Sequence, residues 1–359
     1  MKPIKLKTLL FFTLITVVSL AFKGEEKVTK IFSKECNLTD NSNVYIENRF
    51  GQVNIENWDK NTISIMIEIK AEHPNRNKAE KILNAINIEF SQSGDDISAI
   101  TKIDEDMMKS WNTHFSDNSS KEFSIDWEVK MPKQTNLHIY NKYGDIFIDE
   151  LSGQAKIELK YGNLKANKIL RDNSDPLSSL QLAYGNASID EVNWFKIELK
   201  QSKISIIKVV AIVSVTKNSS ISIKQVNSMV TESKHDSYDI GKIKNFICNG
   251  EYSNFNIIEL TKKLEITSNY GDISIESIPS LFESIKFVAN YSSIYAKIDP
   301  TASYYLDADI KFGNIKYNTP ANVNKIESPS HIEANGIVGK NKSTSSKVIL
   351  NLKYGSAKL

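Results

Sequence analysis

The segment that decides the fold is LEITSNYGDISIE, Leu264 to Glu276. Apolar side chains alternate at 264 and 266 before the Tyr270-Gly271 pair, and again at 273 and 275 after it. Such alternation is typical of a β-strand with one buried face. The parity of the buried positions changes at Gly271, as it does when one residue is inserted at a bulge or corner. Because glycine reaches positive φ at low cost, we expect the glycine to form that corner.

The same unit recurs along the chain. Seven aromatic-glycine pairs carry it, at Phe50-Gly51, Tyr143-Gly144, Tyr161-Gly162, Tyr184-Gly185, Tyr270-Gly271, Phe312-Gly313 and Tyr354-Gly355. Two further copies, at Tyr252 and Tyr291, have serine in place of the glycine. The repeat of about nineteen residues is too short for a βαβ crossover but suits one coil of a parallel β-helix. The sequence therefore predicts an all-β protein, a parallel β-solenoid in which each coil, or rung, is strand, corner, strand and turn.

The aromatic residues of the repeat share the parity of the buried aliphatic positions. We therefore expect them to point inward as an internal column. The alternative is an exposed aromatic stripe on which sugars or bases stack. Cys248 lies at an inward position, four residues before Tyr252, which predicts a small buried side chain. With Cys36 it is expected to give two free thiols.

Between Tyr184 and Tyr252 the repeat loses its aromatic residue. Weaker copies begin at Gln201 and Asn218, and another lies near Ser237. Strand-forming residues such as Ile204 and Ile221 remain, so the coils are expected to continue. We predict that the solenoid is narrow or irregular in this stretch.

The N-terminus has the pattern of an export signal. Three lysines (Lys2, Lys5 and Lys7) precede an uncharged run from Thr8 to Phe22, and this run is short for a membrane span. Residues 1–21 are therefore predicted to be a signal peptide, with a retained N-terminal anchor as the alternative. The expected location is exported, in the periplasm, on the outer membrane surface or outside the cell.

Residues 22–132 are predicted to form a first rung around Phe50-Gly51 and a capping module with one helix. The helix follows Pro74 and has Ala79, Ile82, Leu83 and Ile86 on one face. Short strands are expected near 88–90, 97–103 and 123–129, with a loop from 104 to 121. Such a module would cover the open edge of a solenoid. Residues 133–359 are predicted to be the solenoid itself.

Composition and motifs do not point to catalysis. The net charge falls from +2 to −1 when the three N-terminal lysines are removed, so no basic field for nucleic acid is present. The sequence has no HExxH, GxSxG or phosphate-binding glycine motif. We predict no catalytic, cofactor-binding or metal-binding residue. A polysaccharide lyase or hydrolase on a β-helix is the alternative, and its one dense polar cluster would be His235, Asp236 and Asp239.

Aspartate or asparagine repeatedly follows the corner pair. The six positions are Asp145, Asn163, Asn186, Asn254, Asp272 and Asn314. These residues tolerate tight corners and hydrogen-bond nearby backbone, which is the interpretation we favour. A column of oxygen ligands for Ca²⁺ is the alternative, although only two of the six are carboxylates.

The repeated Tyr-Gly-Asp/Asn-Ile units, preceded by Pro132 after the strand that begins at Trp127, resemble the "putative adhesin" family. The members are bacterial envelope proteins with β-solenoid domains, related to the head GIN domains and otherwise of unknown function. The resemblance covers about Asn43 to Leu359. It implies an exported, non-catalytic adhesin or envelope-binding protein, with a surface glycan or envelope protein as partner. A self-associating envelope scaffold is a further alternative, with end-to-end contact through the C-terminal rung, Lys353 to Leu359.

Overall fold

The computed structural model describes residues 16–21, 26–107, 123–173 and 175–359. It is nearly all β, as predicted, with a long parallel sheet of regularly spaced strands. Its contacts divide the chain into two compact units, Met1–Ala155 and Lys156–Leu359, and each is described by itself below. Most of the predicted signal peptide (residues 1–15) and most of the predicted loop (residues 108–121) lie outside the described residues, and residues 105–107, which were expected in that loop, are helical.

The described residues of the first unit contain ten strands, one nine-residue helix and the helical residues 105–107. The strands are β1 (Thr16–Ala21), β2 (Glu26–Asn37), β3 (Asn43–Arg49), β4 (Val53–Asn57), β5 (Thr62–His73), β6 (Ile86–Ser93), β7 (Asp96–Ile103), β8 (Phe123–Met131), β9 (Asn136–Lys142) and β10 (Ile146–Leu151). β3 and β4 form the predicted first rung, and β9 and β10 pair with them in parallel as the next rung. On the other side of the first rung, β7 pairs with β3 and β8 pairs with β4. The open edge of the first rung is therefore covered by strands of the N-terminal module.

The predicted helix is α1 (Arg76–Asn84). The side chain of Asn75 accepts hydrogen bonds from the backbone N–H groups of Asn77 and Lys78, which satisfies donors that the first turn leaves free. Ala79, Ile82 and Leu83 are buried, as the pattern predicts. Ile86 was expected on the same helical face, but it is the first residue of strand β6. The helix ends at Asn84, so the fully buried Ile86 contributes to the sheet instead.

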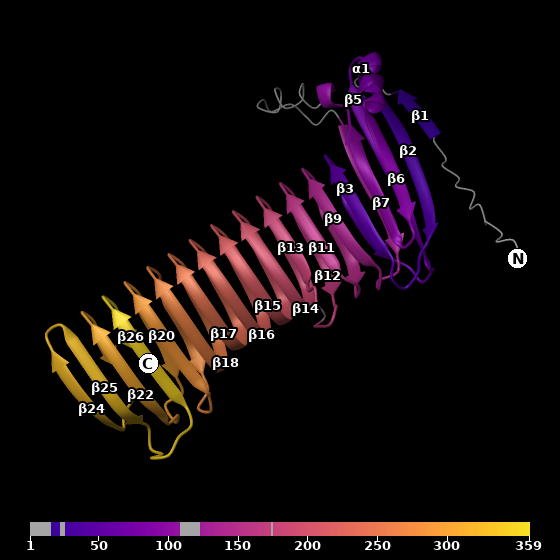
Figure 1. Cartoon of the computed structure of the whole chain (residues 1–359). Coiled ribbons are helices and arrows are strands. Elements are labelled where there is room, and N and C mark those ends of the chain that lie inside the picture. The colour runs from indigo at the N-terminus through magenta and orange to yellow at the C-terminus, as the bar shows by residue number, and fades with distance from the viewer. Residues whose placement is uncertain (1–15, 22–25, 108–122, 174) are drawn as a thin grey trace, which may run out of the picture. The chain divides into compact units, whose positions relative to one another are not determined.

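The second unit is the main body of the solenoid. Its strands are β11 (Ala155–Lys160, which begins at the last residue of the first unit), β12 (Asn163–Ile169), β13 (Ser178–Ala183), β14 (Asn186–Lys200), β15 (Lys203–Lys217), β16 (Ser220–Lys234), β17 (Ser237–Glu251), β18 (Asn254–Asn269), β19 (Ile273–Ile278), β20 (Ser284–Asn290), β21 (Ser293–Ile298), β22 (Tyr304–Lys311), β23 (Asn314–Lys316), β24 (Ala321–Ser328), β25 (His331–Val338), β26 (Lys347–Lys353) and β27 (Ser356–Lys358). Figure 1 shows the parallel strands stacked side by side along this unit. Each corner lies between a strand that enters it and a strand that leaves it.

The stretch that was predicted to be irregular is the most regular part of the solenoid. β14, β15, β16 and β17 are each fifteen residues long. They pair in parallel with a constant register, so that Lys203 faces Ser220 and Ser220 faces Ser237. The prediction was wrong because it treated loss of the aromatic residue as loss of the coil. The inward aliphatic positions are intact here, and they hold the coil together.

Stacked aliphatic side chains form the core of the second unit. One isoleucine from each of six successive rungs lies in register with the next, and all six are at most 1% exposed. They are Ile189, Ile206, Ile223, Ile240, Ile257 and Ile275. Burial of an isoleucine side chain contributes about 1.5–3 kcal/mol. The isoleucine of one rung is buried only when a neighbouring rung packs against it. The two-residue alternation in the sequence therefore predicted the core correctly.

Both cysteines are free and buried, as expected. Cys248 is 3% exposed, and burial raises the pKa of its thiol well above the usual value. Burial also raises the pKa of the Cys36 thiol. Since the thiolate is the reactive form, both side chains serve as small core residues.

The C-terminal rung lies inside the solenoid, which contradicts the predicted end-to-end contact. β26, which ends at Lys353, pairs with β20 on one side and with β22 on the other. β27 likewise lies between β21 and β23. Residues 353–359 therefore offer no open end through which a second chain could stack. Beyond β22 the sheet continues with the antiparallel hairpin of β25 and β24.

Candidate ligand-binding corner

One residue of each corner adopts the left-handed backbone conformation. Its φ lies between 47° and 64° at all twelve positions, which we call corner positions. They are Phe50, Tyr143, Tyr161, Tyr184, Gln201, Asn218, His235, Tyr252, Tyr270, Tyr291, Phe312 and Tyr354. The aromatic residue, and not the glycine that follows it, therefore makes the turn. This conformation costs about 1–2 kcal/mol for an L-residue other than glycine.

The prediction that the aromatic residues point inward is wrong for the second unit. Seven of its corner aromatics are 40–55% exposed: Tyr161, Tyr184, Tyr252, Tyr270, Tyr291, Phe312 and Tyr354. Strand alternation applies only while the backbone stays extended, and positive φ at the corner turns the side chain outward. In the first unit Phe50 is buried, because it packs edge-on against Phe123 of the N-terminal module at 5.3 Å.

The exposed rings stack on one another in an aromatic ladder. From Tyr252 through Tyr270 and Tyr291 to Tyr354, successive ring centroids are 4.8–4.9 Å apart and the planes are within 12° of parallel. His235 extends the ladder at one end and Phe312 at the other. On the far side of Gln201 and Asn218, Tyr184 stacks on Tyr161 at 4.9 Å and 5°. Within the ladder each ring covers the faces of its neighbours, so ring edges and tyrosine hydroxyls are what solvent meets.

The glycine after the corner position is required by close packing. A Cβ added at Gly185 would lie 1.9 Å from the carbonyl oxygen of Gly162, and at Gly271 2.0 Å from that of Ser253. Neither glycine has positive φ. The expectation that glycine supplies the conformational freedom of the corner is therefore wrong. Its role is to let the backbones of adjacent rungs approach.

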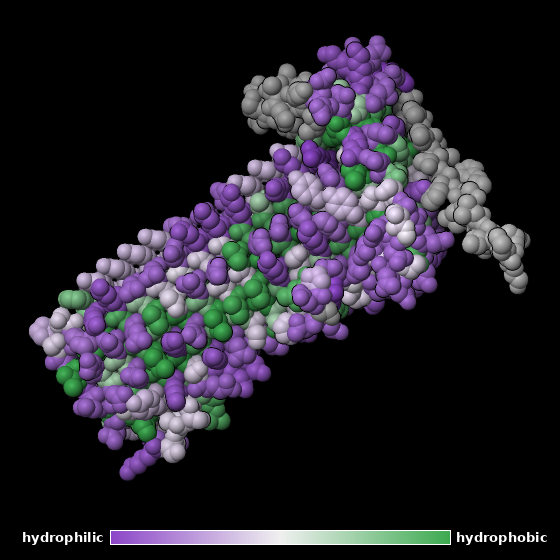
Figure 2. Space-filling view, in the orientation of Figure 1, coloured by the Kyte–Doolittle hydropathy of each residue, from purple (hydrophilic) through white to green (hydrophobic). Residues whose placement is uncertain are grey.

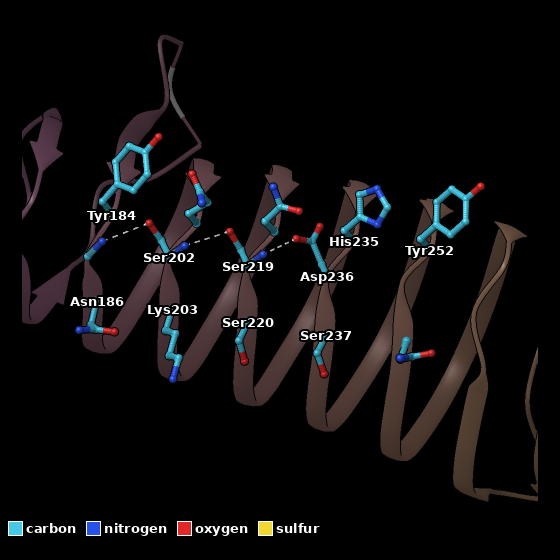
Figure 3. Close-up of a pocket in the computed structure, with 14 residues that line it drawn as sticks. Tyr184, Asn186, Ser202, Lys203, Ser219, Ser220, His235, Asp236, Ser237 and Tyr252 are labelled. Carbon is cyan, nitrogen blue, oxygen red and sulfur yellow. Dashed lines mark hydrogen bonds between the residues drawn. The ribbon is translucent and has the colours of Figure 1, made fainter.

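The aromatic ladder breaks at two successive rungs, where Gln201 and Asn218 occupy the corner position. A trough of about 800 Å³ lies over the break. One wall is the row of corner residues from Tyr184 to Tyr252, and the other is a polar row that includes Lys203, Ser220 and Ser237 (Figure 3). The shorter side chains between the two tyrosines leave this space open. We call it the trough.

The floor of the trough is a chain of hydrogen bonds between rungs (Figure 3). The backbone N–H of Ser202 donates to Ser219 Oγ at 3.3 Å, and that of Ser219 donates to Asp236 Oδ1 at 2.7 Å. The Asp236 carboxylate accepts three further hydrogen bonds, from Thr216 Oγ1, Ser233 Oγ and the Lys234 N–H. Four donors hold this 4%-exposed carboxylate, so its oxygens are engaged in the structure of the corner.

Three lysines surround the break without a carboxylate partner. Lys200 and Lys217 precede the two amide corner residues and face each other in register on adjacent strands, and Lys203 stands in the opposite wall. None of the three forms an ion pair with any residue that the structure describes. The next lysine of the row, Lys234, is paired with Glu251 at 2.7 Å. Because these lysines have no carboxylate partner, the electrostatic potential around the break is positive. Two of them repel each other across adjacent strands.

The predicted Asp/Asn row hydrogen-bonds neighbouring rungs. Asn186 Nδ2 donates to Asn163 Oδ1 at 2.8 Å. Asn254 Oδ1 accepts from the Asp272 N–H, and Asp272 Oδ1 accepts from the Ser293 N–H. These contacts agree with the structural interpretation of the row. Among the described residues, no group of three or more His, Cys, Asp or Glu side chains is placed to hold a metal ion.

The polar cluster expected for a polysaccharide enzyme does not come together. His235 lies on the corner and stacks on Tyr252 at 4.8 Å. Asp236 is buried, as described above. Asp239 is exposed on the next strand, where it accepts a hydrogen bond from Asn256. The three side chains face different environments and form no common site.

Apolar residues also gather on the strand face that Figure 2 presents, where β15, β16 and β17 lie. Val213, Val230 and Ile247 stand in register on these strands and are 40–44% exposed. Val215 lies beside them at 46%. This patch was not predicted, since each residue taken alone fits an ordinary outward position of a strand.

No helix within the described residues is both long and apolar enough to cross a membrane. No family model matches the chain, and no curated protein matches it.

Two solved structures are similar to it in fold. A putative cell adhesion protein from Clostridium sporogenes is 10% identical with a TM-score of 0.19, and the match covers 92% of this chain and 98% of that one. A putative lipid binding protein from Parabacteroides distasonis is 10% identical with a TM-score of 0.31, over 92% and 96% of the two chains. At these values the likeness carries no inference about function, and the family suggested by the repeat stays a prediction.

Proposed function

We propose that the chain is an exported, non-catalytic binding protein of the cell envelope, an adhesin-like solenoid that holds an extended polymer along its corner. The observation that carries this proposal is the aromatic ladder. From Tyr252 to Tyr354 it presents the same exposed ring edge and hydroxyl at a spacing of 4.8–4.9 Å. A regular row of identical groups suits a ligand that is itself long and repetitive.

The energetics of the corner support a role for tyrosine in particular. The left-handed conformation costs a non-glycine residue about 1–2 kcal/mol. Each stacked ring pair offsets this cost by about 0.5–1.5 kcal/mol. Phenylalanine would supply the same stacking, yet four adjacent rungs of the ladder carry a hydroxyl instead. No hydrogen bond of the Tyr252, Tyr270 or Tyr291 hydroxyl to another described residue is present, so all three are available to a ligand.

Export is supported by the N-terminal sequence, in which Lys2, Lys5 and Lys7 precede an apolar run. An envelope location follows from that signal together with the resemblance of the repeat to envelope solenoid proteins. The ligand is then expected among surface polymers that the exported chain meets.

The experiment compares retention of the mature chain on purified envelope polysaccharide and on envelope protein fractions, by sedimentation with the insoluble material. The test variant carries Tyr252→Phe, Tyr270→Phe and Tyr291→Phe, which removes three hydroxyls and keeps the stack. We expect at least tenfold weaker binding, since three hydrogen bonds of about 0.5–1.5 kcal/mol each are lost. Tyr295→Phe is the matched control, because Tyr295 is 38% exposed but lies off the corner. Equal retention of the triple variant, or no retention of the wild-type chain on any fraction, would refute the proposal.

A further inference from the structure

We infer that the break in the aromatic ladder is a binding site for a short acidic stretch of polysaccharide, one that bears carboxylates such as those of uronic acid residues. This inference rests on the proposed function and names the ligand class and the place where it is recognised. The ligand would lie in the trough between Tyr184 and Tyr252 (Figure 3).

The break exposes ring faces that the aromatic ladder elsewhere covers. Tyr184 stacks on Tyr161 with one face, and its other face looks toward the rung of Gln201. His235 stacks on Tyr252 with one face, and its other face looks toward the rung of Asn218. Faces of aromatic rings are the surfaces on which the apolar faces of sugar rings pack. The break is therefore bounded on both sides by stacking platforms.

The separation of these platforms fits more than one sugar ring. Tyr184 and His235 are three rungs apart, and strands in a sheet are about 4.8 Å apart, which places the two residues about 14 Å from each other along the solenoid. The trough continues over His235 to Tyr252, one rung further. A segment of two or more rings is therefore the expected occupant.

Unpartnered polar groups line the space between the platforms. The side-chain amides of Gln201 and Asn218 form no hydrogen bond with any described residue, and both residues are exposed. Ser220 and Ser237 stand in the opposite wall. An amide offers a donor and an acceptor together, as a pair of neighbouring sugar hydroxyls requires. These groups can orient a ligand that the rings hold by contact.

The charge at the break selects an acidic ligand. Lys200, Lys203 and Lys217 have no carboxylate partner in the described chain. The Lys200 ammonium lies 5.9 Å from the centroid of the Tyr184 ring, near the outer limit of a cation–π contact, so it can turn toward a ligand. Carboxylates on successive sugar rings would be matched by lysines on successive rungs.

A second lysine pair shows that lysines alone do not make the site. Lys311 and Lys353 also face each other in register before adjacent corner residues. There the corner residues are Phe312 and Tyr354, which stack on each other at 4.9 Å and leave no trough between them. This pair is therefore a matched control for the charge of Lys200 and Lys217.

The test measures binding of oligogalacturonate to the mature chain by isothermal titration calorimetry, with a neutral oligosaccharide of equal length beside it. Gln201→Tyr with Asn218→Tyr completes the aromatic ladder and fills the trough. We expect it to weaken oligogalacturonate binding at least thirtyfold while the thermal midpoint is kept. Lys200→Gln with Lys217→Gln is expected to weaken it at least tenfold and to remove the preference over the neutral sugar. Lys311→Gln with Lys353→Gln is expected to leave binding within twofold.

The outcomes separate this inference from the proposed function. If the wild-type chain is retained on envelope polysaccharide but the Gln201/Asn218 variant and the Lys200/Lys217 variant both bind oligogalacturonate as the wild type does, the inference is overturned and the proposed function stands. Binding of the neutral sugar equal to that of the acidic one would also overturn it. Tighter binding of single-stranded oligonucleotide than of oligogalacturonate, lost in the same variants, would assign the trough to another polymer. If the wild-type chain binds no envelope fraction at all, the proposed function itself fails.

Discussion

Replacement of Tyr270 tests whether ring stacking or backbone strain dominates the free energy of a corner. Tyr270 lies between Tyr252 and Tyr291, at 4.8 and 4.9 Å, with planes within 3° of parallel and φ of 58°. Two stacked contacts are worth about 2 kcal/mol together. Tyr270 is 45% exposed as a residue, so its buried half, about 100 Å², adds at most about 2.5 kcal/mol.

Three variants of Tyr270 separate these contributions. Tyr270→Phe keeps stacking and strain and should change the free energy of unfolding by less than about 0.5 kcal/mol. Tyr270→Ala loses the ring and keeps the strained φ, so a loss of about 4 kcal/mol is expected. Tyr270→Asn loses the ring but adopts positive φ more readily, which should recover about 1 kcal/mol and leave a loss of about 3 kcal/mol.

The assay is urea denaturation of the full chain at pH 7, followed by intrinsic fluorescence and by circular dichroism. Both probes are needed, because a repeat protein can unfold in parts, and only coincident transitions justify a single free energy. If the alanine and phenylalanine variants unfold at the same urea midpoint, the aromatic ladder has no stabilising role. An asparagine variant more stable than the wild type would show that strain outweighs stacking.

Three further predictions concern a buried tyrosine, a closely packed glycine and the two buried thiols. Burial raises the pKa of Tyr238 from 10 to about 12. This shift contributes about 3 kcal/mol to the free energy of unfolding, which is fully present below pH 10 and is lost as the pH rises toward 12. The urea midpoint of the Tyr238→Phe variant should therefore depend less on pH over that range than the midpoint of the wild type. Gly271→Ala should lower the free energy of unfolding by about 2 kcal/mol, measured in urea, because its Cβ would meet the Ser253 carbonyl oxygen. Cys36 and Cys248 should react with a thiol reagent only as the chain unfolds, and fast labelling of the native protein would contradict their burial.

The interior of the solenoid could be predicted because a two-residue period encodes it directly. Every extended residue on the same face shares one parity, so Leu264, Ile266 and Ile275 were assigned to the core from the sequence and are buried. The two-residue rule predicts side-chain direction only where the backbone is extended. At the corner, parity gives no information about the direction of the side chain.

The residue types at the corner position indicate that the aromatic side chains point outward, but the prediction from strand parity did not use them. Gln201, Asn218 and His235 occupy the same slot as the tyrosines. Amide and imidazole side chains in a core column would each need a buried hydrogen-bond partner, whereas asparagine and histidine are enriched among residues with positive φ. A slot that alternates between tyrosine and these residues is typical of an exposed left-handed corner.

The order of the last rungs could not be read from local patterns. β26 carries the same alternation as its neighbours, and nothing in that alternation says that it lies between β20 and β22. The hairpin of β24 and β25 interrupts the sequence order of the rungs, and the chain then returns to fill the gap. Pairing of distant strands depends on which edges remain open, which is a property of the folded sheet.

The break in the aromatic ladder does not weaken the fold, because a corner can be stabilised in two ways. At a tyrosine corner, the stacking energy of the ring offsets the backbone strain of positive φ. At Asn218 and His235 the strain itself is smaller, because asparagine and histidine adopt positive φ more readily. Beneath the break the core is unchanged, with Ile206 and Ile223 as buried as the isoleucines elsewhere in the column. Ring residues at this corner are therefore dispensable for the coil. A break placed over an intact core leaves one unstacked ring face at Tyr184 and one at His235, two unpartnered amides and three unpaired lysines, which is the arrangement that a binding site requires.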